Sequence, residues 1–288
     1  MFDFRYHALS LAGVFIALVV GLLLGVAIGD KELVSSARED IRDSLRSDVR
    51  RADGERDAAK TELSAERQFS AKAYPILTDG RLRRRKIGLV TLGPTDVSAD
   101  EVRKWLGPSG ASLSLVAELD DDVDTKALAE RARGTRYQDV DEDPGLVARL
   151  GHRMGVQMVN GGRLIGRLRT ALLQSTSGEF GSLDGVIVVR PASTPRDKQA
   201  GDRLAAMQDG IVRGLADSGV KVVGIESANA DPSQIGWYRD RALSTVDNID
   251  ETAGQAALVF VLAGADGAFG RRDGAQELLP PVVATAPG

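Results

Sequence analysis

The sequence has 288 residues, of which 27% are charged, and a formal net charge of -4 at pH 7. This slight acidic excess gives no electrostatic case for nucleic-acid binding. Cysteine is absent and histidine occurs only at His7 and His152. The composition therefore excludes disulfides, thiolate nucleophiles and cysteine-based metal sites, and it supplies few ligands for a transition metal. The length leaves room for one sizeable soluble domain and an extended connector.

The first predicted element is a membrane helix over residues 8–29, ALSLAGVFIALVVGLLLGVAIG, which contains no charged side chain. A helix of this length matches the roughly 30 Å hydrocarbon core of a bilayer. Residues 27–29 have the small-x-small pattern of a signal-peptide cleavage site, but the apolar run is longer than the 7 to 15 residues typical of such peptides. We therefore predict a retained signal anchor in the cell membrane. Arg5 flanks the segment on its N-terminal side, whereas the charges of residues 30–32 nearly cancel, which predicts residues 1–7 in the cytoplasm and the rest of the chain outside.

Small residues recur at every fourth position of this segment and predict a ridge on which a second helix can pack closely. Glycine and alanine are also common in membrane helices generally. Five small positions in register nevertheless favour self-association or a partner helix. The positions are Gly13, Ala17, Gly21, Gly25 and Gly29. A single span cannot line a helical pore by itself.

Residues 30–74 are rich in Ala, Glu, Arg, Asp and Lys, contain no proline, and predict a long helical stalk. Apolar residues at spacings near seven indicate an imperfect coiled coil. The alternative is a lone solvated helix with ion pairs between neighbouring turns. We favour a homodimer, because the glycine ridge would already hold two copies together and raise their effective concentration. The apolar positions are Val34, Ile41, Leu45, Ala52, Ala59 and Phe69.

Residues 75–274 predict an extracytoplasmic α/β domain, because short apolar strands alternate with amphipathic helices. This pattern favours a mainly parallel sheet covered on both faces, Rossmann-like in appearance. No strand is predicted between Asp121 and Thr176, and helix is chosen over strand from Thr252 onward. Residues 275–288 are predicted to be a flexible tail. The predicted strands are 87–92, 113–119, 185–190 and 221–226, and the predicted helices are 98–105, 125–133, 144–159, 163–174 and 200–218.

In an open α/β sheet, ligands bind beyond the carboxyl ends of the strands. The informative loops are then GPTDVS, PASTPRD and SANADPSQ, which follow Leu92, Arg190 and Glu226. None of them is a nucleotide fingerprint, and no nucleophile elbow accompanies His152. The sequence therefore predicts no enzyme, no catalytic residue and no cofactor.

Two groups of side chains invite comparison with metal sites. His152, Met154 and Met158 lie close along one predicted helix, and thioethers can bind Cu(I). Methionines one turn apart are more often core residues, and residue 154 lies about 200° around the helix from His152. Asp247, Asn248 and Asp250 lack the further carboxylate of a calcium loop, so an Asx-rich turn is favoured. We therefore predict no metal site.

Both ends of the chain resemble a known family. The opening FDFRYHALSLAGVFIALVVGLLLG and the later STVDNIDETAGQAALVFVLAGADGAFG with ELLP are similar to motifs of the actinobacterial MctB (mycobacterial copper transport protein) family, also called SteB-like. The resemblance spans the order of parts: anchor, coiled coil and α/β domain. The matching positions are Asp3, Arg5, Tyr6, His7, Val246, Asp247 and Asn248.

The resemblance implies a role in copper transport or copper homeostasis in the cell envelope. For some relatives it also implies a septal role in cell-wall regulation and cell division, alongside a partner membrane protein. No family metal ligand carries over to this sequence. One span and no cysteine fit poorly with moving copper, so we favour a dimeric scaffold or a part of an assembly. The alternative is a structural coiled-coil partner at the septum that does not handle copper.

Overall fold

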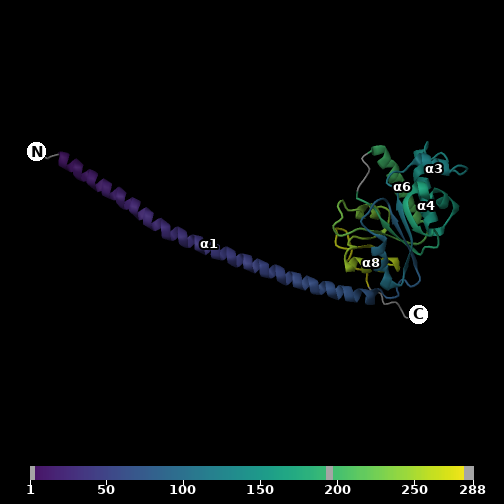
Figure 1. The fold of residues 1–288 in the computed structure, drawn as a ribbon, viewed down its shortest axis with the longest axis horizontal. Helices are drawn as coiled ribbons and strands as arrows, with labels where there is room; N and C mark the ends of the chain where they lie inside the picture. Colours follow the sequence, from purple (N-terminus) through teal and green to yellow (C-terminus); the bar gives the residue numbers. More distant parts are fainter. Residues whose placement is uncertain (1–3, 193–196, 282–288) are drawn as a thin grey trace. The chain divides into compact units, whose positions relative to one another are not determined.

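The computed structural model describes residues 4–192 and 197–281, without the side chains of residues 4, 5 and 28–39. Contacts divide the chain into two units, Met1–Glu66 and Arg67–Gly288. Helix α1, Phe4–Thr78, makes up the described part of the first unit and continues into the second. The second unit contains the sheet and all the other helices of the described chain (Figure 1).

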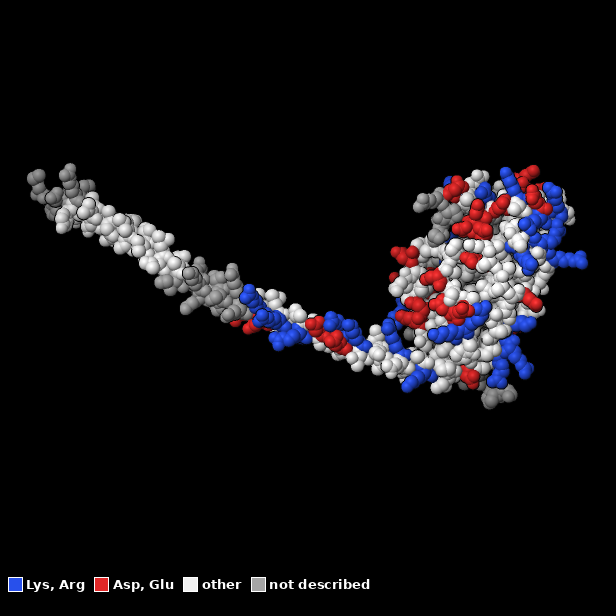
Figure 2. All heavy atoms as spheres, in the orientation of Figure 1, with Lys and Arg blue, Asp and Glu red and all other residues white. Residues whose placement is uncertain are grey.

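Within α1, residues Tyr6–Ala27 have a mean hydropathy of 2.7 and are long enough to cross a membrane. They overlap the predicted anchor, and Figure 2 shows this part of the helix without acidic or basic side chains. The predicted stalk, 30–74, is helical throughout. Exposed ion pairs join neighbouring turns of the stalk, such as Arg51 with Asp48 at 2.5 Å. Each contributes only a few tenths of a kcal/mol to helix stability. Pairing of two stalks into a coiled coil stays a prediction.

The second unit is built on a sheet of seven strands in the order β3-β2-β1-β4-β5-β6-β7. All neighbouring pairs are parallel except β2 with β3. The four strands predicted from apolar runs are present, and they form the buried centre of the sheet together with β6. The strands are β1 Lys86–Thr91, β2 Ser112–Leu119, β3 Leu173–Gly178, β4 Gly185–Val189, β5 Lys221–Ile225, β6 Ser244–Val246 and β7 Ala268–Phe269.

The prediction was wrong about the stretch before Thr176. The helix predicted over 163–174 ends at Leu172, and strand β3 begins at the next residue and pairs antiparallel with β2. All residues of β3 after Leu173 are exposed and polar or glycine. An edge strand of this kind shows no alternation of apolar residues in the sequence. It is defined only by its pairing with β2 in the folded domain.

Helices cover both faces of the sheet, as predicted (Figure 1). One core lies under α3, α4, α5 and α6, and the other lies under α2 and α8. Helix α8 is apolar on all sides because it is almost completely buried, which confirms the choice of helix there. The helices are α2 Ala99–Leu106, α3 Thr125–Arg131, α4 Pro144–Asn160, α5 Arg163–Leu172, α6 Lys198–Ala216, α7 Ile235–Arg239 and α8 Thr252–Leu262, with a 3-10 turn η1 at Gly107–Ser109.

Helices α4 and α6 approach each other unusually closely. A Cβ atom built on Gly155 would lie 2.1 Å from the carbonyl oxygen of Ile211, and one built on Gly214 would lie 2.0 Å from that of His152. Only glycine permits this backbone contact. The pairing fixes α6, which brings Gln208 to the carboxyl edge of the sheet.

The end of α1 packs on the α/β domain. Tyr74 is buried with Ala256 and Phe260 of α8, and its hydroxyl donates a hydrogen bond to the carbonyl of Trp105. Burial raises the pKa of Tyr74 to about 12. The guanidinium of Arg81 stacks 4.4 Å from the Phe260 ring centre. Aromatic packing and one buried hydrogen bond thus fix the last turns of α1 to the domain.

Candidate functional site

A cleft of about 440 Å³ lies beyond the carboxyl ends of β1, β4 and β5. Strands β1 and β4 are neighbours, and the chain leaves them in opposite directions across the sheet. This is the switch point at which open α/β sheets bind ligands. All three loops singled out from the sequence line the cleft. Its walls are residues 94–97, 189–192, 225–227, 229, 230, 232 and 234.

Among the residues that the structure describes, Arg190 is the only basic one that lines this cleft. Its Nε donates to Oε1 of Gln208 at 3.1 Å and its Nη1 donates to Oε1 of Gln234. The guanidinium also lies 4.8 Å from the ring centre of Trp237. All of these partners are neutral, and among the residues that the structure describes no carboxylate lies within ion-pair distance of Arg190. Burial lowers the pKa of the Arg190 guanidinium, and the nearby charge of Arg241 lowers it further.

Buried side chains hold the three strand ends together behind Arg190. The backbone amide of Arg190 donates to the Tyr238 hydroxyl at 2.7 Å, and that hydroxyl lies 3.4 Å from the carbonyl of Ile225. The Tyr238 ring covers Gly224, where any Cβ would lie within 2.4 Å of the ring. Gln208 donates to the carbonyl of Leu92 at 2.7 Å. The ends of β1, β4 and β5 are thereby fixed relative to α6 and α7.

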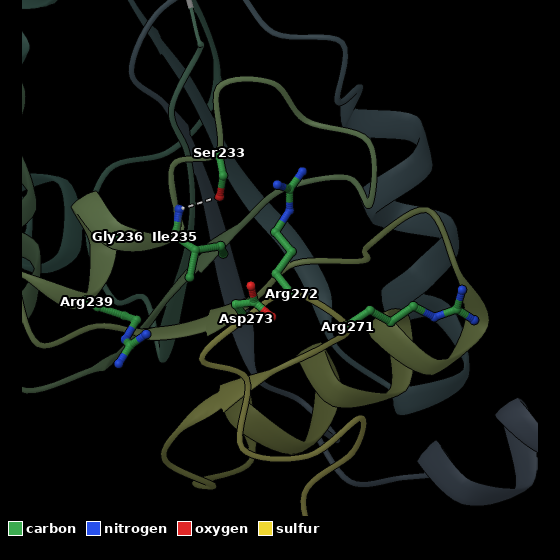
Figure 3. A pocket seen from close by; sticks show the side chains of 7 residues that line it. All are labelled: Ser233, Ile235, Gly236, Arg239, Arg271, Arg272 and Asp273. Carbon is green, nitrogen blue, oxygen red and sulfur yellow. Dashed lines mark hydrogen bonds between the residues drawn. The ribbon is translucent and has the colours of Figure 1, made fainter.

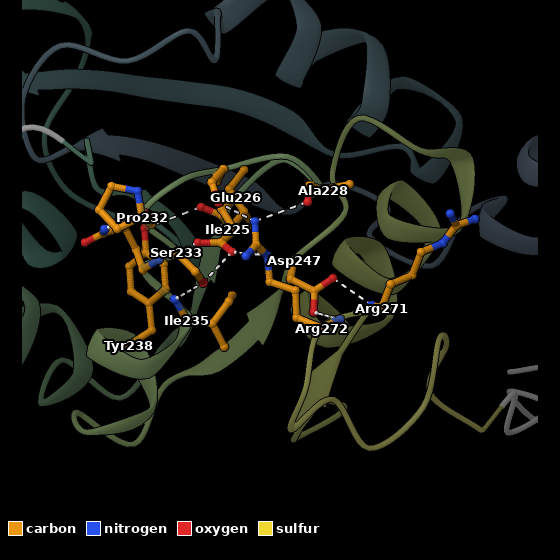
Figure 4. A network of polar contacts seen from close by, with 12 residues as sticks. Ile225, Glu226, Ala228, Pro232, Ser233, Ile235, Tyr238, Asp247, Arg271 and Arg272 are labelled. Carbon is orange, nitrogen blue, oxygen red and sulfur yellow. Dashed lines mark hydrogen bonds and ion pairs between the residues drawn. The ribbon is translucent and has the colours of Figure 1, made fainter.

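Glu226 lies at the end of β5 and is only 5% exposed. Its carboxylate accepts hydrogen bonds from the Ser233 hydroxyl at 2.7 Å and the Gln234 amide at 2.6 Å. Nε of Arg272 lies 2.9 Å from its Oε1. Burial raises the pKa of Glu226, while these hydrogen bonds and Arg272 act against that rise. Figure 4 shows this carboxylate at the centre of a network that ties the 226–234 loop to the residues after β7.

The C-terminal motif supports the other side of the network. The Asp247 carboxylate accepts hydrogen bonds from the backbone amides of Arg271 at 2.7 Å and Arg272 at 2.9 Å. Gly270 makes the turn at φ +139°, and a Cβ there would lie 1.9 Å from Oδ1 of Asp247. Asp247 thus positions the backbone from which Arg272 reaches Glu226 (Figure 4).

The other motif residues also have packing roles in the part of the chain that is described. Val246 is in the core, and buried Asn248 donates to Glu251 at 3.2 Å. The Asp250 carboxylate accepts from the amide of Ala228 at 2.7 Å. At the other end of the chain, Tyr6 and His7 are exposed on α1. Asp3 and the side chain of Arg5 lie outside the described part of the structure.

A second, more basic depression of about 480 Å³ lies beside Ser233 (Figure 3). Arg239, Arg271 and Arg272 line it together with Asp273. Arg271 pairs with Glu251 at 3.0 Å and Arg272 pairs with Glu226, so two of the three cations already have carboxylate partners. Arg239 and Arg271 are exposed. The depression is a solvated surface and not an enclosed site.

The residues considered as copper ligands do not fit a copper site. Met154 and Met158 are fully buried in the core under α4 and α6, as expected for core methionines. His152 instead lies at the surface, with Nε2 at 2.8 Å from Oδ2 of Asp217. Over the described ranges, no group of three or more His, Cys, Asp or Glu side chains could hold a metal ion. The two sulfurs and the imidazole therefore do not converge on one position.

The comparison with known families decides which proteins this chain is related to. The family model described as "Copper transport outer membrane protein, MctB" matches residues 1–280. The chain belongs to the MctB family. Proteins named "Copper transporter MctB" from Mycobacterium tuberculosis and Mycobacterium bovis are 31% identical to it over 134 residues. The alignment covers 46% of this chain and 42% of each of those relatives.

In this MctB-family chain, the sequence indicated the loops of the cleft but not the side chains that organise it. Arg190 and Glu226 each follow an apolar strand directly, which is a usable signal. Gln208 and Tyr238 have no such signal, because each looks like an ordinary residue of an amphipathic helix. Arg272 follows strand β7, which has only two residues and is too short to show the alternating apolar pattern of a strand.

Proposed function

We propose that this protein is a single-pass envelope protein that serves copper homeostasis as a dimeric scaffold within an assembly. Its N-terminus lies in the cytoplasm and its α/β domain outside. Membership of a copper transport family supports the copper role. We propose no catalytic step for the domain. The observation that carries the scaffold role is the surface of α1, which presents two apolar features, a glycine ridge and a stripe on the stalk.

The first feature is the glycine ridge of the membrane segment. Nothing lies within 4 Å of a Cβ built on Gly13, Gly21 or Gly25. No contact in the described part of the chain therefore requires glycine at these positions, and a helix interior otherwise disfavours glycine by about 1 kcal/mol relative to alanine. Close packing against a second membrane helix is a physical reason for small residues here.

The second feature is an apolar stripe on the stalk. Ile41, Leu45, Val49 and Leu63 are between 44% and 59% exposed. At 100° per residue these four side chains lie within an arc of about 80°. A stripe of this width is what a coiled-coil seam buries. A second copy of the chain would bury this stripe and, in the same dimer, would pack against the glycine ridge of the membrane segment.

Copper itself would pass through the assembly and not through a single chain. The described residues contain one helix that could span a membrane, and one helix cannot enclose a polar path. The thioethers of the domain are buried in its core. We therefore assign the copper path to a partner or to several copies, with this chain as the structural subunit.

A membrane association assay on the full chain tests the scaffold. Replacing Gly21 and Gly25 with leucine should weaken self-association, because the larger side chains separate the helices. The matched control replaces Val19 with leucine and Leu23 with isoleucine, on the opposite side of the same helix, and should associate normally. If both variants associate equally well, the glycine ridge does not mediate self-association.

A separate experiment tests the copper role. Cells lacking the protein should show altered copper accumulation, while liposomes containing the purified protein alone should stay impermeable to copper. Normal copper accumulation together with a division defect would favour the septal alternative. Cross-linking in intact cells would then identify the partner membrane protein in either case.

A further inference from the structure

We propose that the cleft at the carboxyl ends of β1, β4 and β5 binds a small molecule that carries one carboxylate or phosphate group, held by the guanidinium of Arg190. This assignment goes beyond copper handling and does not depend on dimerisation. It rests on the charge of Arg190, on the way its guanidinium is held, and on the composition of the cleft walls.

The charge argument comes from a comparison of three partly buried arginines on this side of the domain. Arg241 pairs with Asp209 at 2.8 Å, and Arg272 pairs with Glu226 at 2.9 Å. Arg190 alone among these three has only neutral partners, two amide oxygens and an indole ring. Burying a cation without a counter-charge is costly. An anion in the cleft would supply the missing counter-charge.

The guanidinium is also held in place before any ligand arrives. Gln208 and Gln234 accept hydrogen bonds from Nε and Nη1, and Trp237 packs against the planar group. No hydrogen bond in the described structure uses the remaining nitrogen, Nη2. Arginine presents its donors as a rigid fork that matches carboxylate and phosphate oxygens. A fixed fork loses little entropy when it binds an anion.

The cleft walls indicate what the rest of the ligand is like. The volume of about 440 Å³ is within the range for small-molecule sites. Proline, valine, isoleucine and alanine supply about half of the residues that line the cleft, and Thr95, Ser227, Asn229 and Gln234 add polar groups. Asp96 and Glu226 also line the cleft, and the Glu226 carboxylate already pairs with Arg272. The ligand therefore combines one anionic group with a largely apolar body and a few hydrogen-bonding atoms.

The depression around Arg239 is a weaker candidate for the same chemistry. Two of its three arginines already have carboxylate partners, and Figure 3 shows the Arg271 side chain directed away from Arg239 and Arg272. Arg239 therefore offers a matched control. It is a cation on the same domain that the proposal does not place in the cleft.

Isothermal titration of the full chain in an uncharged detergent tests the proposal with phenyl phosphate, benzoate and the neutral benzyl alcohol as probes. At least one of the two anions should bind, and the alcohol should bind at least about tenfold more weakly because it lacks the charge that Arg190 recognises. Arg190→Gln should weaken anion binding by about tenfold or more, and Arg239→Gln should leave it unchanged.

A second variant keeps the test informative if Arg190→Gln does not fold. Gln234→Glu places a carboxylate beside Arg190, so it should weaken anion binding at least as much while raising the melting temperature. Gln138→Glu adds the same charge at an exposed position away from the cleft and should do neither. Absence of binding by both anions, equal binding of the alcohol, or unchanged anion binding by Arg190→Gln or Gln234→Glu would overturn the proposal.

Discussion

The guanidinium of Arg272 lies against the buried carboxylate of Glu226, with Nε 2.9 Å from Oε1. The pair joins the loop after β5 to the loop after β7, and Asp247 fixes the backbone on the arginine side. Figure 4 shows these three side chains in one network. Asp247 and Arg272 therefore shape the wall of the cleft from the edge of the sheet.

Arg272→Leu should destabilise the domain by about 2 to 3 kcal/mol, because it leaves the Glu226 carboxylate buried without its counter-charge. Urea denaturation measures this loss. The double variant Glu226→Gln with Arg272→Leu should be more stable than Arg272→Leu alone, since no buried charge then remains. If the double variant were the less stable of the two, the two side chains would not act as a pair.

Gly155→Ala should destabilise the α4 and α6 pairing by about 2 to 3 kcal/mol, because the new methyl group would meet the Ile211 carbonyl at 2.1 Å. Gly166→Ala in α5 is the matched control. Nothing lies within 4 Å of a Cβ there, so alanine should stabilise the helix by up to about 1 kcal/mol. Thermal unfolding of both variants checks the contrast, and a similar loss in both would contradict it.

Met154→Leu and Met158→Leu should each cost less than about 1.5 kcal/mol, because leucine fills nearly the same core volume. Copper accumulation in cells that carry the variants should equal that of the parent. Alanine at either position should cost about 2 to 5 kcal/mol by creating a cavity. A leucine variant that folds normally but alters copper accumulation would restore these thioethers as candidate ligands.

Asp266→Asn should lower stability at neutral pH and lose this effect in acid. Nζ of Lys221 lies 2.5 Å from Oδ1 of Asp266, and the hydrogen bond from Lys221 lowers the pKa of the aspartate. A carboxyl group with a lowered pKa in the folded state stabilises the protein above its unfolded pKa of about 3.9. That stabilisation disappears as the pH falls through the folded pKa. Denaturation of both proteins at pH 7 and pH 3 should therefore show a difference that narrows in acid, and a constant difference would exclude the titration of Asp266 as its cause.

The sequence alone was sufficient for those features that depend on local composition. A long uncharged run indicates a membrane helix, and the runs IGLVTL and GVIVVR indicate buried strands, because each carries its own apolar pattern. The rule for parallel sheets then led from the strands to the three loops of the cleft.

Only the tertiary structure decided the edges of the sheet and the side chains of the site. Strands β3, β6 and β7 are polar or very short, so pairing with neighbouring strands defines them and not a period in the sequence. Likewise Gln208 from the middle of α6 and Gln234 from the loop after β5 meet at Arg190, beside the carboxyl edge of the sheet. The order of the strands decides which distant residues share that edge, and the local periodicity of the sequence does not predict strand order.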